Sequence, residues 1–271
     1  MWKKFLKWGG KAVSWSEENP EKVSSFWKRF KKKRDFLILG PGGVGKSTLA
    51  KYLAGDYNDP TQVPGDYVES LGLEEVDIPQ LGATAIVPPG QEFRAEVFWD
   101  DLAKDIVKGN RFKGLILVYS FGFHSLAKSK TSHALYDAAN DAEFLQAYTQ
   151  KNRKLEQAFR LKIAELLRKR KKKIWVLEVV TKQDLWWDER PAAEAFYQPD
   201  MKDLVLEESA VLDSAKMFSA SVLLSFKIDT FKSSADELLK SNVMGYTTVK
   251  QAKGLDELNR AIRALTEWEQ K

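Results

Sequence analysis

The chain has 271 residues, of which 44% are hydrophobic and 30% charged, a balance typical of a folded globular domain. It contains no cysteine, which excludes disulfide bonds and thiolate metal sites and indicates a reducing compartment, expected to be the cytoplasm. Its 43 basic and 38 acidic residues leave a net charge of +5, so the distribution of charge matters more than its total. No apolar run reaches the ~20 residues that a membrane span needs, and the lysine-broken start MWKKFLKW is not typical of a signal peptide.

Residues 1–34 are predicted to form a basic N-terminal helical arm. Trp2, Phe5 and Leu6 share one side of a helical wheel and lysines occupy the other, which is the pattern of an amphipathic helix. A second short helix is expected to follow and to end in KRFKKKR, residues 28–34.

From residue 35 onward, short apolar runs alternate with helical patterns. Runs that fit strands occur at residues 35–40, 68–78, 83–88, 113–120, 172–180 and 219–228. Helical patterns occur at residues 46–54, 98–109, 143–170 and 254–268. Strands that alternate with helices predict one α/β domain over 35–271, with a mostly parallel sheet and helices on both faces.

The segment GPGGVGKST matches the phosphate-loop pattern G-x-x-x-x-G-K-[ST] and lies between a predicted strand and a predicted helix. Such a loop turns several backbone N–H groups toward a phosphate, and the following helix adds its positive end. Lys46 would reach the β- and γ-phosphates, and the Ser47 hydroxyl would bind Mg²⁺. The residues predicted to hold the phosphates are Gly40, Gly42, Gly43, Val44, Gly45, Lys46, Ser47 and Thr48.

The tetrapeptide TKQD, from Thr181 to Asp184, follows a buried strand and is predicted to select the base. A carboxylate at Asp184 can accept hydrogen bonds from both the ring N–H and the exocyclic amine of guanine, a pair of donors that adenine lacks. The aliphatic stem of Lys182 can lie over the base. Ligands of parallel sheets bind at the carboxyl ends of the strands, where this motif would lie.

With these two motifs the sequence resembles the Ras-like small GTPases over residues 35–271, with insertions. NDPT at 58–61 resembles the start of their first switch, which implies Thr61 as a second Mg²⁺ ligand, with Thr84 as an alternative. PGQE at 89–92 resembles the end of their second switch. That likeness implies that the Gly90 N–H meets the γ-phosphate and that Gln91 orients the attacking water.

The family resemblance extends to FSAS at 218–221, where Ser219 and Ala220 would contact the guanine oxygen. It implies that the protein is a GTPase, a switch that binds GTP or GDP with Mg²⁺ and answers to regulator and effector proteins.

The second switch departs from the family at its first position, where Val87 replaces an aspartate that holds a Mg²⁺-bound water. The bacterial MglA-type GTPases also lack this aspartate and have a proline before Gly-Gln, so the chain most resembles that group here. With one Mg²⁺ partner missing, metal affinity or switch order should weaken. Hydrolysis is therefore expected to be slow and stimulated by a partner. A binding-only pseudo-GTPase and an ATP-using P-loop enzyme remain open alternatives.

Two further pairs of side chains attract attention. Trp186 and Trp187, which follow the TKQD motif, are expected to pack rather than to shield a base. His124 and His133, in an irregular stretch, are expected to be polar surface residues rather than groups that act near the phosphates.

Basic clusters at 28–34, 108–113 and 168–173 each precede a predicted strand. If those strands are parallel neighbours, the clusters gather at the end of the domain opposite the nucleotide. An anionic membrane surface is the favoured partner, which implies a peripheral position on the inner membrane face. An acidic protein and simple solvated charges remain open, and nucleic acid is the least favoured partner.

Overall fold

The computed structural model describes residues 35–57, 73–89, 92–109, 111–126, 129–136, 140–206, 217–223, 230–232, 237–241 and 243–270. The predicted arm, the first-switch Thr61, and Gly90 and Gln91 of the second switch lie outside these residues.

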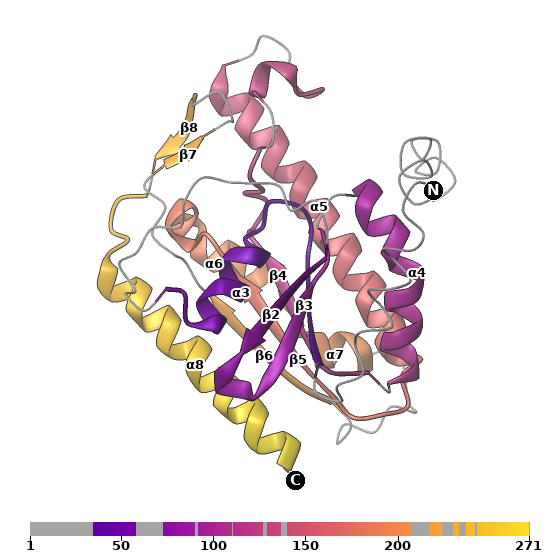
Figure 1. Cartoon of the computed structure of the whole chain (residues 1–271). Helices are drawn as coiled ribbons and strands as arrows, with labels where there is room; N and C mark the ends of the chain where they lie inside the picture. Colours follow the sequence, from indigo (N-terminus) through magenta and orange to yellow (C-terminus); the bar gives the residue numbers. More distant parts are fainter. Residues whose placement is uncertain are drawn as a thin grey trace.

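A six-stranded sheet forms the centre of the molecule, in the order β2-β3-β1-β4-β5-β6 (Figure 1). Its strands are β1 (Asp35–Leu39), β2 (Glu74–Ile78), β3 (Ala83–Val87), β4 (Phe112–Tyr119), β5 (Ile174–Val180) and β6 (Met217–Leu223). All neighbours pair in parallel except β2, which runs antiparallel to β3. A separate two-stranded hairpin consists of β7 (Thr230–Lys232) and β8 (Leu238–Ser241).

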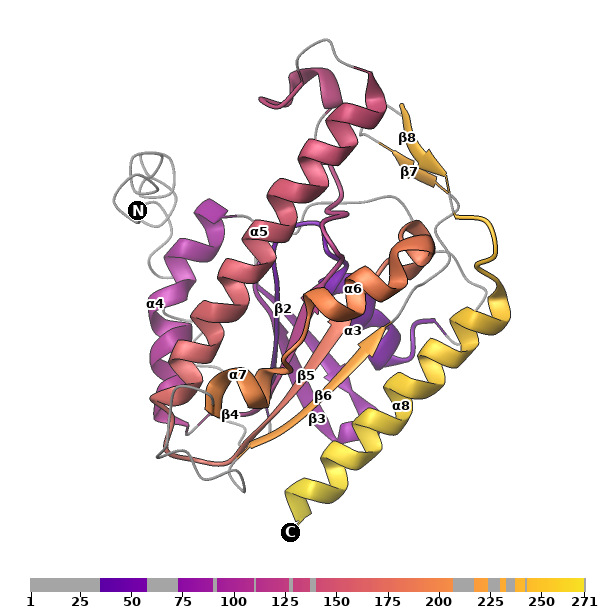
Figure 2. The ribbon, with the colours of Figure 1, turned by 180° about the vertical axis from the view of Figure 1, so that it is seen from behind.

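Helices cover both faces of this sheet (Figures 1 and 2). The α-helices are α3 (Lys46–Ala54), α4 (Glu92–Lys108), α5 (Asp141–Arg168), α6 (Arg190–Phe196), α7 (Met201–Leu206) and α8 (Thr248–Gln270). Short 3-10 turns occur at Pro79–Leu81, Lys130–Ser132, Gln183–Leu185 and Trp187–Glu189. None of the helices in the described part of the chain is both long and apolar enough to cross a membrane.

Successive side chains of each strand point to opposite faces of the sheet, so the core consists of two layers, one on each face. On β1, Leu37 and Leu39 join the cluster under α4, α5 and α7, whereas Phe36 and Ile38 join the cluster under α3 and α8. Every residue of β5 is buried, as expected for a central parallel strand covered on both faces. The predicted α/β fold, with a mostly parallel sheet and helices on both faces, is therefore confirmed.

The structure differs from the expected elements in several places. The helix expected over 254–268 begins at Thr248, and the short helices α6 and α7 are not among the expected elements. The helix expected over 98–109 begins at Glu92, and the strand expected over 219–228 begins at Met217. The β7–β8 hairpin has no counterpart among the expected elements, because its strands of three and four residues are too short to show a period.

The clusters at 108–113 and 168–173 precede neighbouring strands as predicted, because β4 and β5 are adjacent and parallel; the cluster at 28–34 lies outside the described residues. One member is corrected by the structure. Arg170 is buried, and its guanidinium donates to the backbone carbonyls of Ile106, Phe112, Lys172 and Lys173. It therefore fastens the end of α4 to the start of β4 and is no part of a solvent-facing charge. Lys169 and Lys171 to Lys173 remain exposed.

A buried ion pair crosses from α5 to the sheet. The Nε and Nη2 atoms of Arg160 donate to the two carboxylate oxygens of Glu178, at 2.8 and 3.2 Å, and Nη2 also donates to the carbonyls of Tyr197 and Pro199. The pair satisfies the one carboxylate in β5, and it ties α5 to the chain that follows α6.

We expect Arg160→Met to lower the free energy of unfolding by about 3–5 kcal/mol, because it leaves Glu178 charged, buried and without its partner. Urea unfolding measures the change. The matched control is Lys169→Met, which removes an exposed partner of Glu165 and should cost less than about 1 kcal/mol. The double variant Arg160→Met/Glu178→Met should recover part of the loss. Equal effects of the two single variants would contradict the buried-pair interpretation.

Candidate phosphate-binding site

The phosphate loop connects β1 to α3 at the carboxyl edge of the sheet. Gly40 passes so close to β4 that a Cβ atom there would lie 2.2 Å from the Val118 carbonyl oxygen. Gly43 has a positive φ of 73°, and a Cβ there would lie 2.6 Å from the Ser125 nitrogen. The N-cap residue Gly45 provides no side-chain hydrogen bond to α3, and the first turn carries no acidic residue. The first amides of α3 therefore have no capping side chain, which suits an anion.

The side chain of Lys46 folds back onto the start of this loop. Its Nζ atom donates to the carbonyls of Gly40 and Pro41, at 2.9 and 2.8 Å, and the residue is 7% exposed. Burial lowers the pKa of the Lys46 ammonium to about 7, against the opposing influence of the Glu74 carboxylate. A negative ligand in the loop would favour the protonated form again.

The Ser47 hydroxyl donates to the carboxylate of Glu74, the first residue of β2, with 3.2 Å between Oγ and Oε1. Both are hard oxygen donors of the kind that Mg²⁺ takes, so these residues fit a magnesium ion held together with phosphate. Within the described residues there is no group of three or more His, Cys, Asp or Glu side chains placed to hold a metal alone. A metal at Ser47 would therefore have to take most of its ligands from a nucleotide and from water.

The TKQD motif is hydrogen-bonded directly to the phosphate loop, although the first pair of residues in contact is 137 residues apart in the sequence. Thr181 Oγ1 donates to the Val44 carbonyl at 2.6 Å. Lys182 Nζ donates to the Gly43 carbonyl at 2.7 Å, to the Phe123 carbonyl at 2.6 Å and to Ser125 Oγ at 2.9 Å. Burial lowers the pKa of Lys182 to about 7, opposed by the carboxylates of Asp184 and Glu156. Two motifs that the sequence presents separately thus form one site.

Residues 120–126, which follow β4, form a third part of the site that the sequence motifs do not mark; this is the post-β4 segment. The Ser125 N–H donates to the Gly43 carbonyl at 2.9 Å. The Glu156 carboxylate of α5 accepts from the N–H groups of Ser120 and Gly122 and is hydrogen-bonded to His124 Nε2 at 2.9 Å. A single buried acid thus binds two backbone amides and one imidazole of the segment. His124 is a buried structural residue and not the surface residue that was expected.

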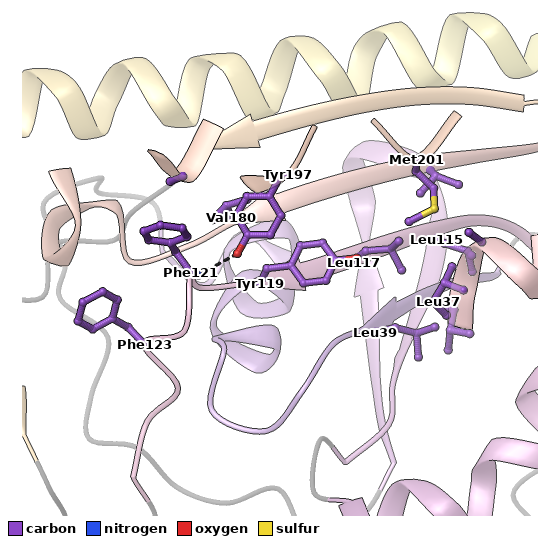
Figure 3. Close-up of a cluster of buried hydrophobic side chains, with 14 of the residues drawn as sticks. Leu37, Leu39, Leu115, Leu117, Tyr119, Phe121, Phe123, Val180, Tyr197 and Met201 are labelled. Carbon is purple, nitrogen blue, oxygen red and sulfur yellow. Dashed lines mark hydrogen bonds between the residues drawn. The ribbon is translucent and has the colours of Figure 1, made fainter. Parts of the chain in front are cut away.

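Aromatic packing fixes the same segment from its other side (Figure 3). The Tyr197 hydroxyl donates to Glu156 at 2.7 Å and accepts from the Phe121 N–H at 3.0 Å. Phe121 in turn meets the ring of Trp186, which is fully buried and donates its indole N–H to the Thr181 carbonyl. The run Y-S-F-G-F-H is the signal that could have marked this segment, because so many aromatic residues beside a glycine are unusual in a solvated loop.

Asp184 lies in the 3-10 turn that follows β5, at the predicted edge of the sheet. It is 0% exposed, and its backbone carbonyl accepts from the Val243 N–H at 2.9 Å. A base can reach this carboxylate only when the packing around it opens. Beside it, Trp187 meets the ring of Tyr246 and the ammonium of Lys250, so both tryptophans pack as expected.

The structure does not bring every expected residue to the site. Ser219 and Ala220 lie within β6, opposite Val176 and Leu177, three residues or more before the carboxyl end of the strand at Leu223. At ~3.3 Å per residue, about 10 Å of strand separates Ala220 from the edge that carries TKQD. The residues that follow β6, 224–229, lie outside the described part of the chain.

Thr84, the alternative Mg²⁺ ligand, is also away from the loop. It lies near the start of β3, paired with Asp35 at the other end of β1, and its hydroxyl donates to Asp77 at 2.8 Å. Val87 is 1% exposed and belongs to the core under α3 and α8, so the valine is a packed residue. His133 packs against the rings of Phe144 and Tyr148. These contacts give each residue a structural role.

Comparison with known proteins gives distant likenesses of fold. No protein-family model matches the sequence, and no curated protein matches it. The mammalian SRP receptor is 15% identical, with a TM-score of 0.41 over 71% of this chain and 91% of that one. The Arl6 BBS3 small GTPase from Trypanosoma brucei, with the bound nucleotide analogue GppNp, is 8% identical, with a TM-score of 0.42 over 88% and 99%.

The ADP ribosylation factor-like GTP-binding protein (small COPII coat GTPase SAR1) from Encephalitozoon cuniculi, in complex with GDP, is 14% identical. Its TM-score is 0.37 over 97% of this chain and 98% of that one. Likenesses at these scores carry no argument about family or function.

Lys182→Met should loosen the post-β4 segment, because the Phe123 carbonyl and the Ser125 hydroxyl lose their shared buried donor. We expect the amide of Ser125 to exchange with solvent at least tenfold faster, as follows from the ~1–3 kcal/mol cost of unsatisfied buried acceptors. Hydrogen exchange read by mass spectrometry measures it. Lys253→Met, at an exposed position of α8, is the control and should leave exchange at residues 120–126 unchanged. Unaltered protection in Lys182→Met would contradict the role given to this lysine.

Proposed function

We propose that the protein is a guanine-nucleotide-binding switch that binds GTP and GDP with Mg²⁺ and hydrolyses GTP slowly. The observation that carries this proposal is the direct bonding of the TKQD motif to the phosphate loop through Thr181 and Lys182. Asp184, the carboxylate proposed to select the base, lies two residues after Lys182, which is hydrogen-bonded to the phosphate loop. The position of this carboxylate relative to the phosphates would therefore be fixed. That relation suits a single nucleotide that spans both motifs.

Each part of the nucleotide then has its own residues. The amides of residues 42–48 and the Lys46 ammonium hold the phosphates, with the positive end of α3 behind them. The Ser47 hydroxyl would hold Mg²⁺, which would supply positive charge to the phosphates. Asp184 accepts both donors of the guanine edge once the packing around it opens.

Hydrolysis is proposed as an in-line attack of water on the γ-phosphorus, which breaks its bond to the bridging oxygen and releases inorganic phosphate and GDP. Gln91 would orient the water and Gly90 would contact the γ-phosphate, as the family resemblance implies. The turnover is proposed to be slow, because Val87 offers no carboxylate to the metal. A partner protein that orders Gln91 would raise the rate.

The end of the domain opposite the phosphate loop is proposed as the docking face. Lys108, Lys169 and Lys171 to Lys173 are exposed there, at the amino ends of β4 and β5. We favour an anionic membrane surface, reached from the cytoplasm together with the arm at 1–34, because each lysine near such a surface contributes about 1 kcal/mol.

Base selection is tested by calorimetric titration with GTP, GDP and ATP, each with and without Mg²⁺. We expect binding of both guanine nucleotides and no binding of ATP. Asp184→Asn should weaken GTP binding by at least tenfold and gain xanthosine triphosphate, because the amide donates where xanthine accepts. Asp188→Asn, in the next turn, is the control. Tight ATP binding would favour the ATP-using enzyme, and tight GTP binding without single-turnover hydrolysis, with or without cell lysate, would favour the pseudo-GTPase.

Nucleotide affinity should fall as the pH rises above 7. Burial sets the pKa of Lys46 to about 7 in this structure, and bound phosphates would raise it, so binding takes up a proton above pH 7. The affinity for GDP should then decrease by up to about tenfold per pH unit between pH 7.5 and 9. Calorimetry in two buffers of different ionisation enthalpy measures the proton uptake.

Two variants of Lys46 control this measurement. Lys46→Arg stays protonated throughout the range and should lose the proton uptake, and Lys46→Ala should abolish binding. A pH-independent affinity without proton uptake would show that the Lys46 ammonium is already charged in the free protein. GDP binding by Lys46→Ala at the original affinity would refute the phosphate-loop assignment.

A further inference from the structure

The missing second-switch carboxylate has a candidate replacement on the neighbouring strand. Val87 is the last residue of β3, and the antiparallel register places Glu74, the first residue of β2, directly opposite it. Residues that face each other in an antiparallel pair have Cα atoms about 4.5–5.5 Å apart. A side chain that starts from Glu74 can therefore reach the region that an aspartate at position 87 would reach.

The side chain of Glu74 does reach the metal-binding end of the loop. Its Oε1 atom accepts from Ser47 Oγ at 3.2 Å, across 27 residues of sequence. It also acts electrostatically on Lys46, the other phosphate-contacting side chain. Glu74 is partly exposed, and its hydrogen bond to Ser47 is partly buried. The neighbouring Glu75 is exposed and, one residue along the strand, points to the opposite face of the sheet.

We propose that Glu74 is the carboxylate that positions Mg²⁺ at this site, in place of the residue that Val87 replaces. This inference rests on the proposed nucleotide binding and gives the metal site a residue that no motif of the sequence marks. Glu74 acts as a positioning residue, through the Ser47 hydroxyl and through the water around the ion.

The physical reason is the hydrogen bond itself. A hydroxyl that donates its proton to a carboxylate turns its lone pairs toward the other side, where a metal ion would be bound. The full negative charge beside it strengthens both that oxygen and any water on the ion as ligands. The valine at position 87 packs in the core, and the carboxylate that it lacks is supplied less directly, from β2 through the Ser47 hydroxyl.

The test uses the full chain loaded with GDP, with the Mg²⁺ concentration varied and the GDP dissociation rate as the readout. Glu74→Gln keeps the size and an acceptor oxygen but removes the charge. We expect it to raise the Mg²⁺ concentration that gives half-maximal retention of GDP by about tenfold or more. Glu75→Gln is the matched control and should leave this concentration unchanged. Direct binding of Mn²⁺, followed by electron paramagnetic resonance, should show the same ratio.

Outcomes separate this inference from the function on which it rests. If the unaltered protein holds GDP more tightly with Mg²⁺ and Glu74→Gln behaves like it, the role of Glu74 is refuted and the switch proposal stands. If the unaltered protein binds no guanine nucleotide, or binds it without any effect of Mg²⁺, both fail. Thermal unfolding of Glu74→Gln within a degree or two of the parent excludes misfolding as the cause of a loss.

A double-mutant cycle with Ser47→Ala tests the route of the effect. If Glu74 acts through the hydroxyl, Glu74→Gln should change the Mg²⁺ requirement by less than about twofold in the Ser47→Ala background, because its partner is already gone. Effects that multiply fully would show that Glu74 acts independently of Ser47, and would overturn the proposal as stated.

Discussion

The shape of the site depends on hydrogen bonds to the carbonyl groups of the phosphate loop that point away from the ligand side. A loop that turns its N–H groups toward a ligand turns its carbonyls into the protein, where each needs a donor. Four such donors are present: Lys46 Nζ, Thr181 Oγ1, Lys182 Nζ and the N–H of Ser125. They come from three segments of the chain. The loop therefore keeps its shape because distant residues hold its outer side.

The post-β4 segment is the least conventional of these supports. Its backbone is irregular, so its polar groups cannot form the hydrogen bonds of a regular strand. The buried carboxylate of Glu156 on α5 accepts hydrogen bonds from its amides instead. Glu156 accepts from two backbone amides of the segment and from Tyr197, whose hydroxyl also receives the Phe121 N–H. A buried carboxylate is stable there because every contact is a donor, which offsets the loss of hydration. The long helix α5 thus has a role beyond covering the sheet.

Much of the fold could be predicted from local sequence. The runs DFLIL and IWVLEVV could be predicted as buried strands, because each is a short apolar run that ends at a glycine-rich loop or a turn motif. Both are strands in the structure. The phosphate loop and TKQD could be placed for the same reason, since each follows such a strand. Local patterns do not, however, reveal where a strand ends. FSAS looks like an edge motif, but β6 continues past it to Leu223.

The parts that could not be predicted are contacts between residues far apart in sequence. Nothing in EEVDI distinguishes Glu74 from Glu75 until the register of β2 against β3 is known. Arg170 looked like one charge among many in RKRKKK, yet its position at the junction of α4 and β4 makes it a buried donor to four carbonyls. In both cases the side chain's role is set by its neighbours in the fold and not by its neighbours in the chain.

The charges of the site complement those of the ligand proposed for it. Two buried lysines, Lys46 and Lys182, both donate to carbonyls of the phosphate loop. Burial lowers the pKa of both to about 7. Lys182 donates to three acceptors. Lys46 donates to two carbonyls at the start of the loop and interacts electrostatically with the carboxylate of Glu74. A polyanion with its metal would give Lys46 a full counter-charge and would give the Ser47–Glu74 pair a cation. The arrangement is electrostatically incomplete for either ion alone, and the proposed nucleotide and magnesium ion together would complete it.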